Sequence, residues 1–445
     1  MLSITKKNKI KQNPFLLFSP FLLLYIILVL KFEVNAFVGD EIRHVYLANN
    51  LLRGFYSPPS PHVNLSIGPG YPMLIAPFLA MHLPYLFIKL LNPLFYYLST
   101  IFLFKSLRQT VSFRKTFLVC LFWSCYYIMF SFMFFMLTEI FTILLVTILI
   151  FCAINAFKPE NIKRTRKYIW LTGIVMGYLA LTKVIFGYVI LSMLIGSGIL
   201  WLIKKGTENY RRGLIVAAIA FGTTIPYLVY TYHLTGRVFY WGTLAGNNMY
   251  WLTSPSTNEY GNWFPDLVKD TLAQKNNPLI AIKTIFVPGA DDSLRLHHQQ
   301  DYNETYQYDG VELDDAFKRL AYKNIKSHPL KYLQNCVSNA GRMLFGYPNS
   351  YMIQKPGDLV RLPPNGIIVV LSLFCLLPTL RSWRKIDYAI RYMLFFAVIY
   401  LGGSVLGSAE IRMFSVVAPV ILLWIAYIIQ KSVRVNLDFY KEQKT

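Results

Sequence analysis

The sequence predicts an all-α membrane protein that crosses the bilayer about ten times, and three observations lead to this prediction. Of the 445 residues, 55% are hydrophobic and only 15% are charged, whereas a soluble domain carries about 25% charged residues. Apolar runs of about 17 to 25 residues recur along the chain, and each is long enough to cross the hydrocarbon core as a helix. These runs are continuous rather than alternating with a period of two, which excludes a transmembrane β-barrel.

The apolar runs divide the chain into two membrane modules joined by a polar segment. Residues 1–232 form an N-terminal transmembrane module, and residues 365–445 contain the last helices and a short tail. Residues 233–364 contain no 18-residue apolar run and are too long for a connector, so they are predicted to fold outside the membrane. The predicted spans are 14–30, 85–104, 114–132, 135–157, 168–181, 184–203, 213–232, 366–380, 388–406 and 414–429.

The first of these spans follows a basic start that contains Lys6, Lys7, Lys9 and Lys11. A basic start followed by an apolar stretch is also the pattern of a signal peptide. The run is longer than the apolar region of a usual signal peptide, which favours an uncleaved span. With either interpretation, residue 37 emerges on the outer side of the membrane.

Clusters of Lys and Arg border the predicted spans and set their orientation. With the N-terminus in the cytoplasm, every short basic cluster falls on the cytoplasmic side, as the positive-inside rule requires. The same rule accounts for the net charge of +22, which would point to nucleic acid in a soluble protein, so no nucleic-acid partner is expected. This topology places residues 37–72 and 233–364 outside. The clusters lie at 105–108, 114–115, 158–167, 204–212, 381–391 and 431–434.

The outer segment 37–72 has a pattern of its own. It opens with two adjacent carboxylates, Asp40 and Glu41, at the expected edge of the bilayer. The run Ile42–Arg53 has the composition of a helix, and a Pro-rich turn follows it. Residues 68–72 (GPGYP) then lead back toward the membrane. We expect this segment to form one wall of an active site.

Further helical pieces lie outside the predicted spans. Residues 74–83 are too short to cross the bilayer and are predicted to be re-entrant or interfacial. Residues 312–326 place Leu313, Phe317, Leu320 and Ala321 on one face at helical spacing. A second helix is predicted to start near Pro329 and to continue toward Phe345, because proline is favoured in a first helical turn.

Several ionisable residues do not belong to the cytoplasmic clusters and fall at outer span ends. Such residues at membrane depth are costly and usually functional. Together they suit group transfer from a lipid phosphate, because an acceptor hydroxyl needs a base and a departing phosphate is stabilised by fixed cations. The residues are Asp40, Glu41, His44, Glu139, Lys183, Glu410 and Arg412.

Each of these residues also has a purely structural explanation. Asp40 precedes a predicted helix and is a good N-cap. Glu41 and Glu139 would each favour the first turn of a helix. Lys183 could be a snorkelling residue at the end of a span. Only their convergence on one face of the membrane points to a site.

The remaining candidate residues also have simpler structural explanations. Glu410 and Arg412 could pair with each other alone, and His44 is expected to be an interfacial helix residue. His297 and His298 are expected in a polar loop rather than in a metal site. The five cysteines show no CxxC or Cys/His metal-binding spacing and are expected to be packing residues.

At this point the motifs resemble a known family, the GT-C membrane glycosyltransferases, and within it the group of the dolichyl-phosphate-mannose-protein mannosyltransferases and the lipid A aminoarabinose transferases. The resemblance covers the whole chain in order. It departs at Ile140, where the family often has proline. The similar stretches are 40–54 (DEIRHVYLANNLLRG), 68–72 (GPGYP), 137–142 (LTEIFT), 179–183 (LALTK), 316–332 with His328-Pro329, and 410–414 (EIRMF) with Pro419.

The resemblance implies a GT-C fold and a transferase that takes a sugar from a polyprenyl- or dolichyl-phosphate carrier on the outer face of the plasma (inner) membrane. Such enzymes usually invert the anomeric centre. The acceptor would be a glycan, a lipid or a protein, and membrane lipids would surround the enzyme. No cofactor is identified, and a divalent metal is left open. A lipid donor also agrees with the expected location, because nucleotide sugars are not expected outside the cell.

The resemblance also assigns roles to residues of this chain. Asp40 would be the general base, while Lys183 and Arg412 would bind the donor phosphate. Glu139 would shape the sugar or acceptor pocket. The other substrate-binding candidates are Glu41, His44, Tyr71 and Glu410.

Two other functions remain as alternatives. A transporter or a flippase of lipid-linked glycans would carry broken helices and charges near the bilayer midplane, often in two related halves. A polysaccharide polymerase or ligase would share the lipid donor but would lack the early Asp-Glu loop. The sequence shows charges at outer span ends and no related halves, which favours the transferase.

Overall fold

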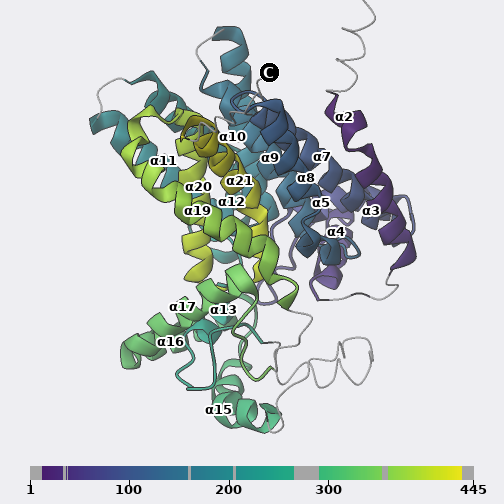
Figure 1. Ribbon diagram of the computed structural model, residues 1–445. Helices are drawn as coiled ribbons and strands as arrows, with labels where there is room; N and C mark the ends of the chain where they lie inside the picture. Colours follow the sequence, from purple (N-terminus) through teal and green to yellow (C-terminus); the bar gives the residue numbers. More distant parts are fainter. Residues whose placement is uncertain are drawn as a thin grey trace, which may run out of the picture.

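The computed structural model describes residues 13–33, 37, 39–158, 162–203, 207–264, 290–352 and 359–432, and the regular elements within these ranges are helices (Figure 1). Within these ranges, seven helical segments are long and apolar enough to cross a membrane. They are the paired α6 and α7 (Tyr85–Lys89 and Leu91–Leu107), α9 (Thr138–Ala156), α11 (Ile185–Ile203), α12 (Glu208–Thr235), α19 (Leu362–Arg381), α20 (Tyr388–Val405) and α21 (Ile411–Ser432).

The count of ten spans is therefore confirmed only in part, since the other three are helical but interrupted or charged. The first divides into α2 (Pro14–Leu17) and α3 (Ser19–Lys31), with proline at the start of α3. Another is α8 (Phe113–Ser124) followed by the short 3₁₀ helix η1 (Tyr127–Phe132). The last, α10 (Ile162–Thr182), has 21 residues, but its first turns are rich in Lys and Arg.

The two most completely buried membrane helices, α9 and α21, form the centre of the bundle. Both are apolar around most of their circumference, as expected for helices that contact protein on every side. They pack against each other, and α9 also packs against α7, α10 and α20. The first turns of α9 and α21 carry Glu139 and Arg412, so the arrangement of the core places these two charged residues near the same end of the bundle.

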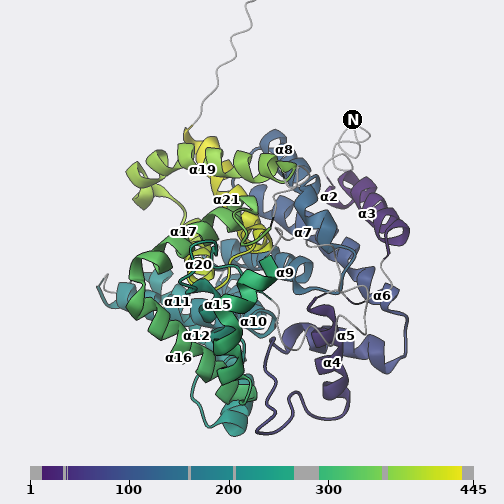
Figure 2. The same ribbon diagram turned by 90° about the horizontal axis from the view of Figure 1, so that it is seen from below.

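The first outer segment folds back as two short helices, α4 (Glu41–Leu52) and α5 (Gly70–Ala80). The predicted helix Ile42–Arg53 is thus confirmed within one residue at each end. The apolar piece predicted at 74–83 belongs to α5, which packs against α4 and α10. In the view from below, α4 and α5 lie on one side of the molecule and α15–α17 on the other (Figure 2).

The described part of the second outer segment contains four helices that gather at the lower end of the bundle (Figure 1). These are α13 (Ala245–Leu252), α15 (Ala290–Thr305), α16 (Gly310–Ser327) and α17 (Pro329–Phe345). The last two confirm the helices predicted at 312–326 and from Pro329. Phe317 of α16 is buried in a separate aromatic core with Tyr250, Trp251 and Tyr302, so this segment has packing of its own.

Candidate active site

A cavity of about 480 Å³ opens at the end of the bundle where α9 and α21 begin. It is lined from both outer segments and from the membrane helices, including Leu244 and Asn248 around the start of α13. Six of the eight residues predicted for the site line it, and the other two, Glu41 and Tyr71, do not. The six are Asp40, His44, Glu139, Lys183, Glu410 and Arg412.

Six helix N-termini among the described residues meet at this cavity, because six helices begin with or directly after residues that line it: α4, α9, α11, α13, α19 and α21. A helix N-terminus carries a partial positive charge and backbone N–H groups without helical partners. Anions, phosphate among them, are therefore favoured at such positions. The backbone alone makes this end of the bundle attractive to a negatively charged ligand.

An alternating network of charges follows the wall of the cavity. Glu139 is buried, and its Oε1 atom lies 2.9 Å from Lys183 Nζ and 3.3 Å from Arg412 Nη1. The same Arg412 Nη1 lies 3.8 Å from Asp40 Oδ2. Arg43 Nη1 donates to the other Asp40 oxygen at 2.9 Å. Three cations thus face two carboxylates, which leaves one positive charge in excess.

The network is incomplete on its carboxylate side. The second oxygen of Glu139, Oε2, is buried and has no hydrogen-bond partner among the described residues. A buried acceptor without a partner costs about 1–3 kcal/mol. A group that donates a hydrogen bond to Oε2 would remove this cost.

The structural explanations for Asp40 and Lys183 are not supported. Asp40 stands directly before α4, but its side chain accepts no capping hydrogen bond from the backbone of that helix. Its carboxylate instead contacts Arg43 and lines the cavity. Lys183 does not snorkel to solvent, because only 17% of its side chain is exposed and its ammonium binds Glu139.

Glu410 and Arg412 do not pair only with each other. Glu410 Oε1 lies 3.8 Å from Nε of Arg342, which comes from α17. Arg342 is buried and donates to the carbonyl oxygens of Ala409 and Pro348 at 3.0 and 2.7 Å. It thereby fixes the turn before α21 and leaves Arg412 to face Glu139 and Asp40.

Glu41 and Tyr71 lie behind the cavity and support its wall. Glu41 is fully buried, and its Oε1 accepts a hydrogen bond from Met136 N at 2.7 Å, which ties α4 to the segment before α9. Tyr71 packs edge-on against the ring of His44, with centroids 4.8 Å apart. Burial lowers the pKa of His44 to about 4, so its ring is neutral at pH 7. His44 Nδ1 has no hydrogen-bond partner in the described part of the chain.

The GPGYP stretch brings the first outer segment against the hairpin that carries Lys183. A Cβ atom at Gly68 would lie 2.2 Å from the carbonyl oxygen of Leu181, and one at Gly70 would lie 2.8 Å from Thr182 N. The hydroxyl of Tyr178 donates to Gly70 O at 2.8 Å. Only glycine allows this close approach, which explains the two glycines of the motif.

Sequence reasoning missed several residues of the cavity wall. Arg43 could have been found, because it follows Asp40 at a spacing of three residues, which places charged side chains side by side on a helix. Asn248 and Trp263 come from the second outer segment and have no local pattern that predicts their position. They show that this segment also lines the cavity.

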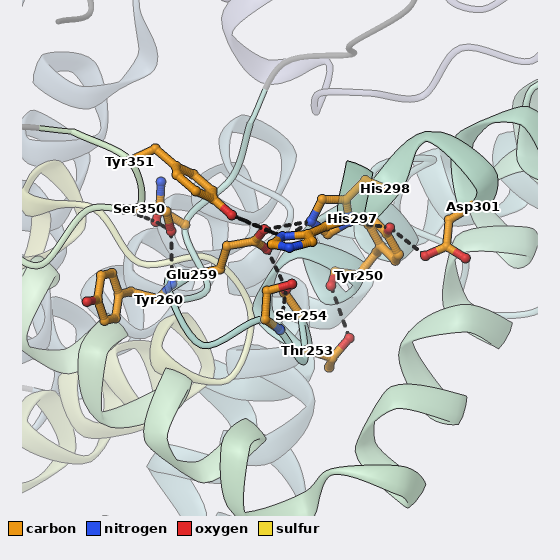
Figure 3. A network of polar contacts seen from close by, with 12 residues as sticks. Tyr250, Thr253, Ser254, Glu259, Tyr260, His297, His298, Asp301, Ser350 and Tyr351 are labelled. Carbon is orange, nitrogen blue, oxygen red and sulfur yellow. Dashed lines mark hydrogen bonds and ion pairs between the residues drawn. The ribbon is translucent and has the colours of Figure 1, made fainter. Parts of the chain in front are cut away.

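The prediction of a polar loop at His297 and His298 is wrong, because both lie in α15. His298 is buried, and its Nε2 lies 2.9 and 2.8 Å from the two oxygens of Glu259 (Figure 3). The physical reason is that α15 packs its inner face against the aromatic core of the outer segment. No group of three or more His, Cys, Asp or Glu residues in the described ranges could hold a metal ion. All five cysteines are free, and four of them are buried.

No protein-family model matches the chain, and no curated protein matches it by sequence. Its structure is similar to that of ArnT from Cupriavidus metallidurans bound to undecaprenyl phosphate, with 12% identity, a TM-score of 0.41, and 94% of this chain and 77% of that chain covered. The apo state of the same protein gives 12% identity, a TM-score of 0.39, and coverage of 93% and 77%.

A second similar structure is the oligosaccharyltransferase from Archaeoglobus fulgidus tethered to an acceptor peptide that contains the NVT sequon. Here the identity is 11% and the TM-score 0.47, with 92% of this chain and 49% of that chain covered, so this chain spans about half of that protein.

Proposed function

We propose that the protein is a glycosyltransferase that moves a sugar from a polyprenyl-phosphate carrier to an acceptor hydroxyl, with the cavity at the start of α9 and α21 as its active site. The observation that carries this proposal is the charged network along one wall of that cavity. It joins Glu139, Lys183, Arg412 and Asp40 through contacts of 2.9 to 3.8 Å. These are the charge types that transfer from a lipid phosphate requires.

Lys183 and Arg412 bind the donor phosphate in this proposal. Both cations contact the same oxygen of Glu139, so they lie close enough to act on one phosphate group. The phosphate gains negative charge as the bond to the sugar breaks, and fixed cations stabilise that charge. The helix N-termini at the cavity act in the same direction.

Asp40 is the general base. Its carboxylate lines the cavity, and about a third of the side chain is exposed, so an acceptor hydroxyl can reach it. Arg43 holds one carboxylate oxygen and directs the other toward Arg412. A base that activates the acceptor on the face of the sugar opposite the leaving phosphate gives inversion at the anomeric carbon.

The remaining polar groups fit the sugar and its acceptor. Glu139 Oε2 and His44 Nδ1 both lack a partner in the part of the chain that the structure describes, and both residues line the cavity. In this proposal a small rotation of each side chain turns this atom toward the cavity, where it accepts a hydrogen bond from a sugar hydroxyl. Glu410 lines the same cavity and is a further candidate, while Glu41 and Tyr71 act from behind by holding α4 and His44 in place.

The cavity faces the outside of the cell in this proposal. Basic residues border the opposite end of the bundle, for example Lys105 in the last turn of α7 and Lys163 at the start of α10. The positive-inside rule places that end in the cytoplasm. A membrane-embedded carrier would then bring the activated sugar to a face that soluble nucleotide sugars do not reach.

A transporter or flippase is a weaker alternative. Such a protein needs ionisable or broken-helix sites near the bilayer midplane. Between Glu139 and its last residue, Ala156, the central helix α9 contains no ionisable side chain except Cys152, and the charged network lies at its first turn. The polymerase or ligase alternative shares the lipid donor and is distinguished by its acceptor.

Deletion of the gene tests the proposal. The expected result is accumulation of one polyprenyl-phosphate-linked sugar in the membrane, identified by mass spectrometry of extracted lipids. The wild-type gene should clear this lipid, and the Asp40→Asn variant, expressed at the same level, should not. A lipid profile that does not change on deletion would contradict a transferase with a lipid-phosphate donor.

A further inference from the structure

A second cavity, of about 490 Å³, lies at the opposite end of α9 from the candidate active site. It is enclosed by the C-terminal ends of α7 and α9, the start of α10 and Pro14 of α2. Glu139 lies near the start of α9 and Asn155 near its end. The helix rises about 1.5 Å per residue over the 16 residues between them, so about 24 Å separates the two cavities. The second cavity therefore lies at the other surface of the bilayer.

This second cavity is strongly basic. Lys105, Arg108 and Lys158 line it, together with Arg164, and its described lining contains no carboxylate. Lys105, Arg108 and Lys158 form no ion pair with any described residue. The lining also offers neutral hydrogen-bonding groups from Gln109, Asn155 and Thr165.

The negative ends of the helix dipoles do not account for the positive charge of this cavity. The C-termini of α7 and α9 each carry roughly half a negative charge, so together they offset about one cation. Lys105, Arg108 and Lys158 supply three. About two positive charges remain around a space large enough for a ligand.

The side chains are held in place around that space. Lys105 Nζ lies 4.7 Å from the ring centroid of Phe15. Arg108 Nη1 donates to Val111 O at 3.0 Å, which anchors one arm of the guanidinium. The aromatic rings of Phe104 and Phe151 form an apolar part of the wall. A site with fixed cations and an apolar wall suits a ligand with a phosphate and a hydrocarbon portion.

We propose that this cavity binds the phosphate headgroup of an anionic phospholipid in the leaflet opposite the candidate active site. The lipid source is favoured because α2, next to the cavity, exposes Phe15 and Leu16 to the surroundings at 43% and 57%, and such exposed apolar side chains contact acyl chains in a membrane. Basic pockets between membrane helices are known to hold lipid headgroups. This site does not depend on the proposed transferase activity.

Lipid titration of the full-length, delipidated protein in detergent, followed by native mass spectrometry, tests the proposal. Phosphatidylglycerol should bind more tightly than phosphatidylcholine. The Lys105→Gln/Arg108→Gln variant should bind phosphatidylglycerol about 30-fold more weakly, because each basic residue near a membrane surface contributes about a fivefold factor. Lys158→Gln alone should weaken it about fivefold, and this single change checks the result if the double variant folds poorly.

The control is Arg381→Gln/Arg384→Gln, which removes two exposed cations outside the cavity and should change affinity by less than about twofold, because it leaves every cavity-lining charge in place. Equal loss in the control and the cavity variant would overturn the site, and so would equal affinity for the two lipids. Displacement of phosphatidylglycerol by millimolar glycerol 3-phosphate or inorganic phosphate would show a site for soluble phosphates and overturn the lipid assignment.

Discussion

Glu259 in the outer segment and Glu139 in the candidate active site are both buried carboxylates, but they differ in how many of their oxygens have hydrogen-bond partners. Both oxygens of Glu259 are fully engaged. Oε1 accepts from Tyr351 at 2.8 Å, Oε2 accepts from the hydroxyl of Ser254, and His298 Nε2 lies within 2.9 Å of both (Figure 3). Glu139 binds two cations through Oε1 alone, and its Oε2 has no partner among the described residues.

The outer network also continues without interruption beyond His298. The hydroxyl oxygen of Tyr250 lies 2.5 Å from His298 Nδ1, and this hydroxyl donates its hydrogen to Asp301 Oδ2 at 2.7 Å (Figure 3). Both ring nitrogens of His298 have partners in this network. The network joins α13, α15 and the loop around Glu259, so its completeness serves the fold of the outer segment.

The difference between the two networks supports the proposal that the one around Glu139 binds a ligand. Buried polar groups in proteins are almost always satisfied, and a structural network gains nothing from an unpaired oxygen. The network at Glu139 leaves an acceptor unpaired, carries an excess positive charge and borders a cavity of about 480 Å³. In the proposed function, a phosphorylated sugar supplies these missing partners.

The largest expected effect comes from breaking the network around Glu259. Glu259→Ala leaves the groups of Ser254, His298 and Tyr351 that bind this carboxylate without their partner, which costs about 1–3 kcal/mol for each. Hydrogen exchange of α13 and α15 should rise strongly. Glu304→Ala, an exposed position on α15, is the matched control and should change stability by less than about 0.5 kcal/mol. Equal exchange in the two variants would show that the Glu259 network does not hold the outer segment.

Breaking the network around Glu139 should instead affect catalysis and leave the fold intact. Arg412→Ala should lower the transfer rate about 10²- to 10³-fold, as removal of a group that stabilises developing negative charge does. Arg412→Lys should recover only part of the rate, because an ammonium cannot form the two-pronged contact of a guanidinium. Arg319→Ala, on the exposed face of α16, is the control. Unchanged donor binding and transfer in Arg412→Ala would remove Arg412 from the site.

Acid should gradually weaken the network around Glu259 and so lower the stability of the outer segment. Burial by itself raises the pKa of Glu259, but hydrogen bonds and the charge of His298 outweigh it and lower that pKa from 4.5 to about 2. The unfolded segment then binds a proton at higher pH than the folded one, so stability is present above about pH 4.5 and is lost as the pH falls toward 2. Tryptophan fluorescence during an acid titration should show this loss, and it should be absent in Glu259→Gln. A stability that stays constant between pH 5 and 2 would contradict this coupling.

The smallest effect is expected at Glu41, which supports the cavity from behind. Glu41→Gln keeps the oxygen that accepts from Met136 N, so it should lower the transfer rate by less than tenfold and stability by about 1 kcal/mol. The measurement is a transfer assay beside a thermal melt. A loss as large as that of a catalytic carboxylate would move the base from Asp40 to Glu41.

The sequence was sufficient for those parts of the protein that local patterns determine. Apolar run length located most spans, and helical spacing located α16 and α17 almost to the residue. The convergence of Asp40, Glu139 and Arg412 followed from topology, because helices that begin on the same side of a bundle bring their first turns together. The actual pairing of Glu139 with Lys183 requires the packing of α9 against α10, which no local pattern contains.

Other features could not be predicted for the same reason. Glu259 and His298 are 39 residues apart, and only the tertiary fold of the outer segment makes them partners. The sequence predicts continuous spans near Ser19 and Cys125, where the helices are interrupted, because hydropathy averages over a helix break. The adjacent carboxylates predict that Glu41 lies in the site with Asp40, but successive positions on a helix point about 100° apart, and Glu41 points into the core.

The most direct test of the proposed function is transfer by purified Asp40→Asn protein, with the lipid-linked sugar that accumulates on deletion as donor. Asparagine preserves the size of the side chain but cannot take the proton of the acceptor hydroxyl, and a general base contributes about 10²- to 10⁴-fold. Asp40→Asn should therefore fold normally and bind the donor within about threefold of wild type, while transfer falls by at least about 10²-fold. Transfer at a rate close to wild type would contradict the assignment of Asp40 as the base and of this cavity as the active site.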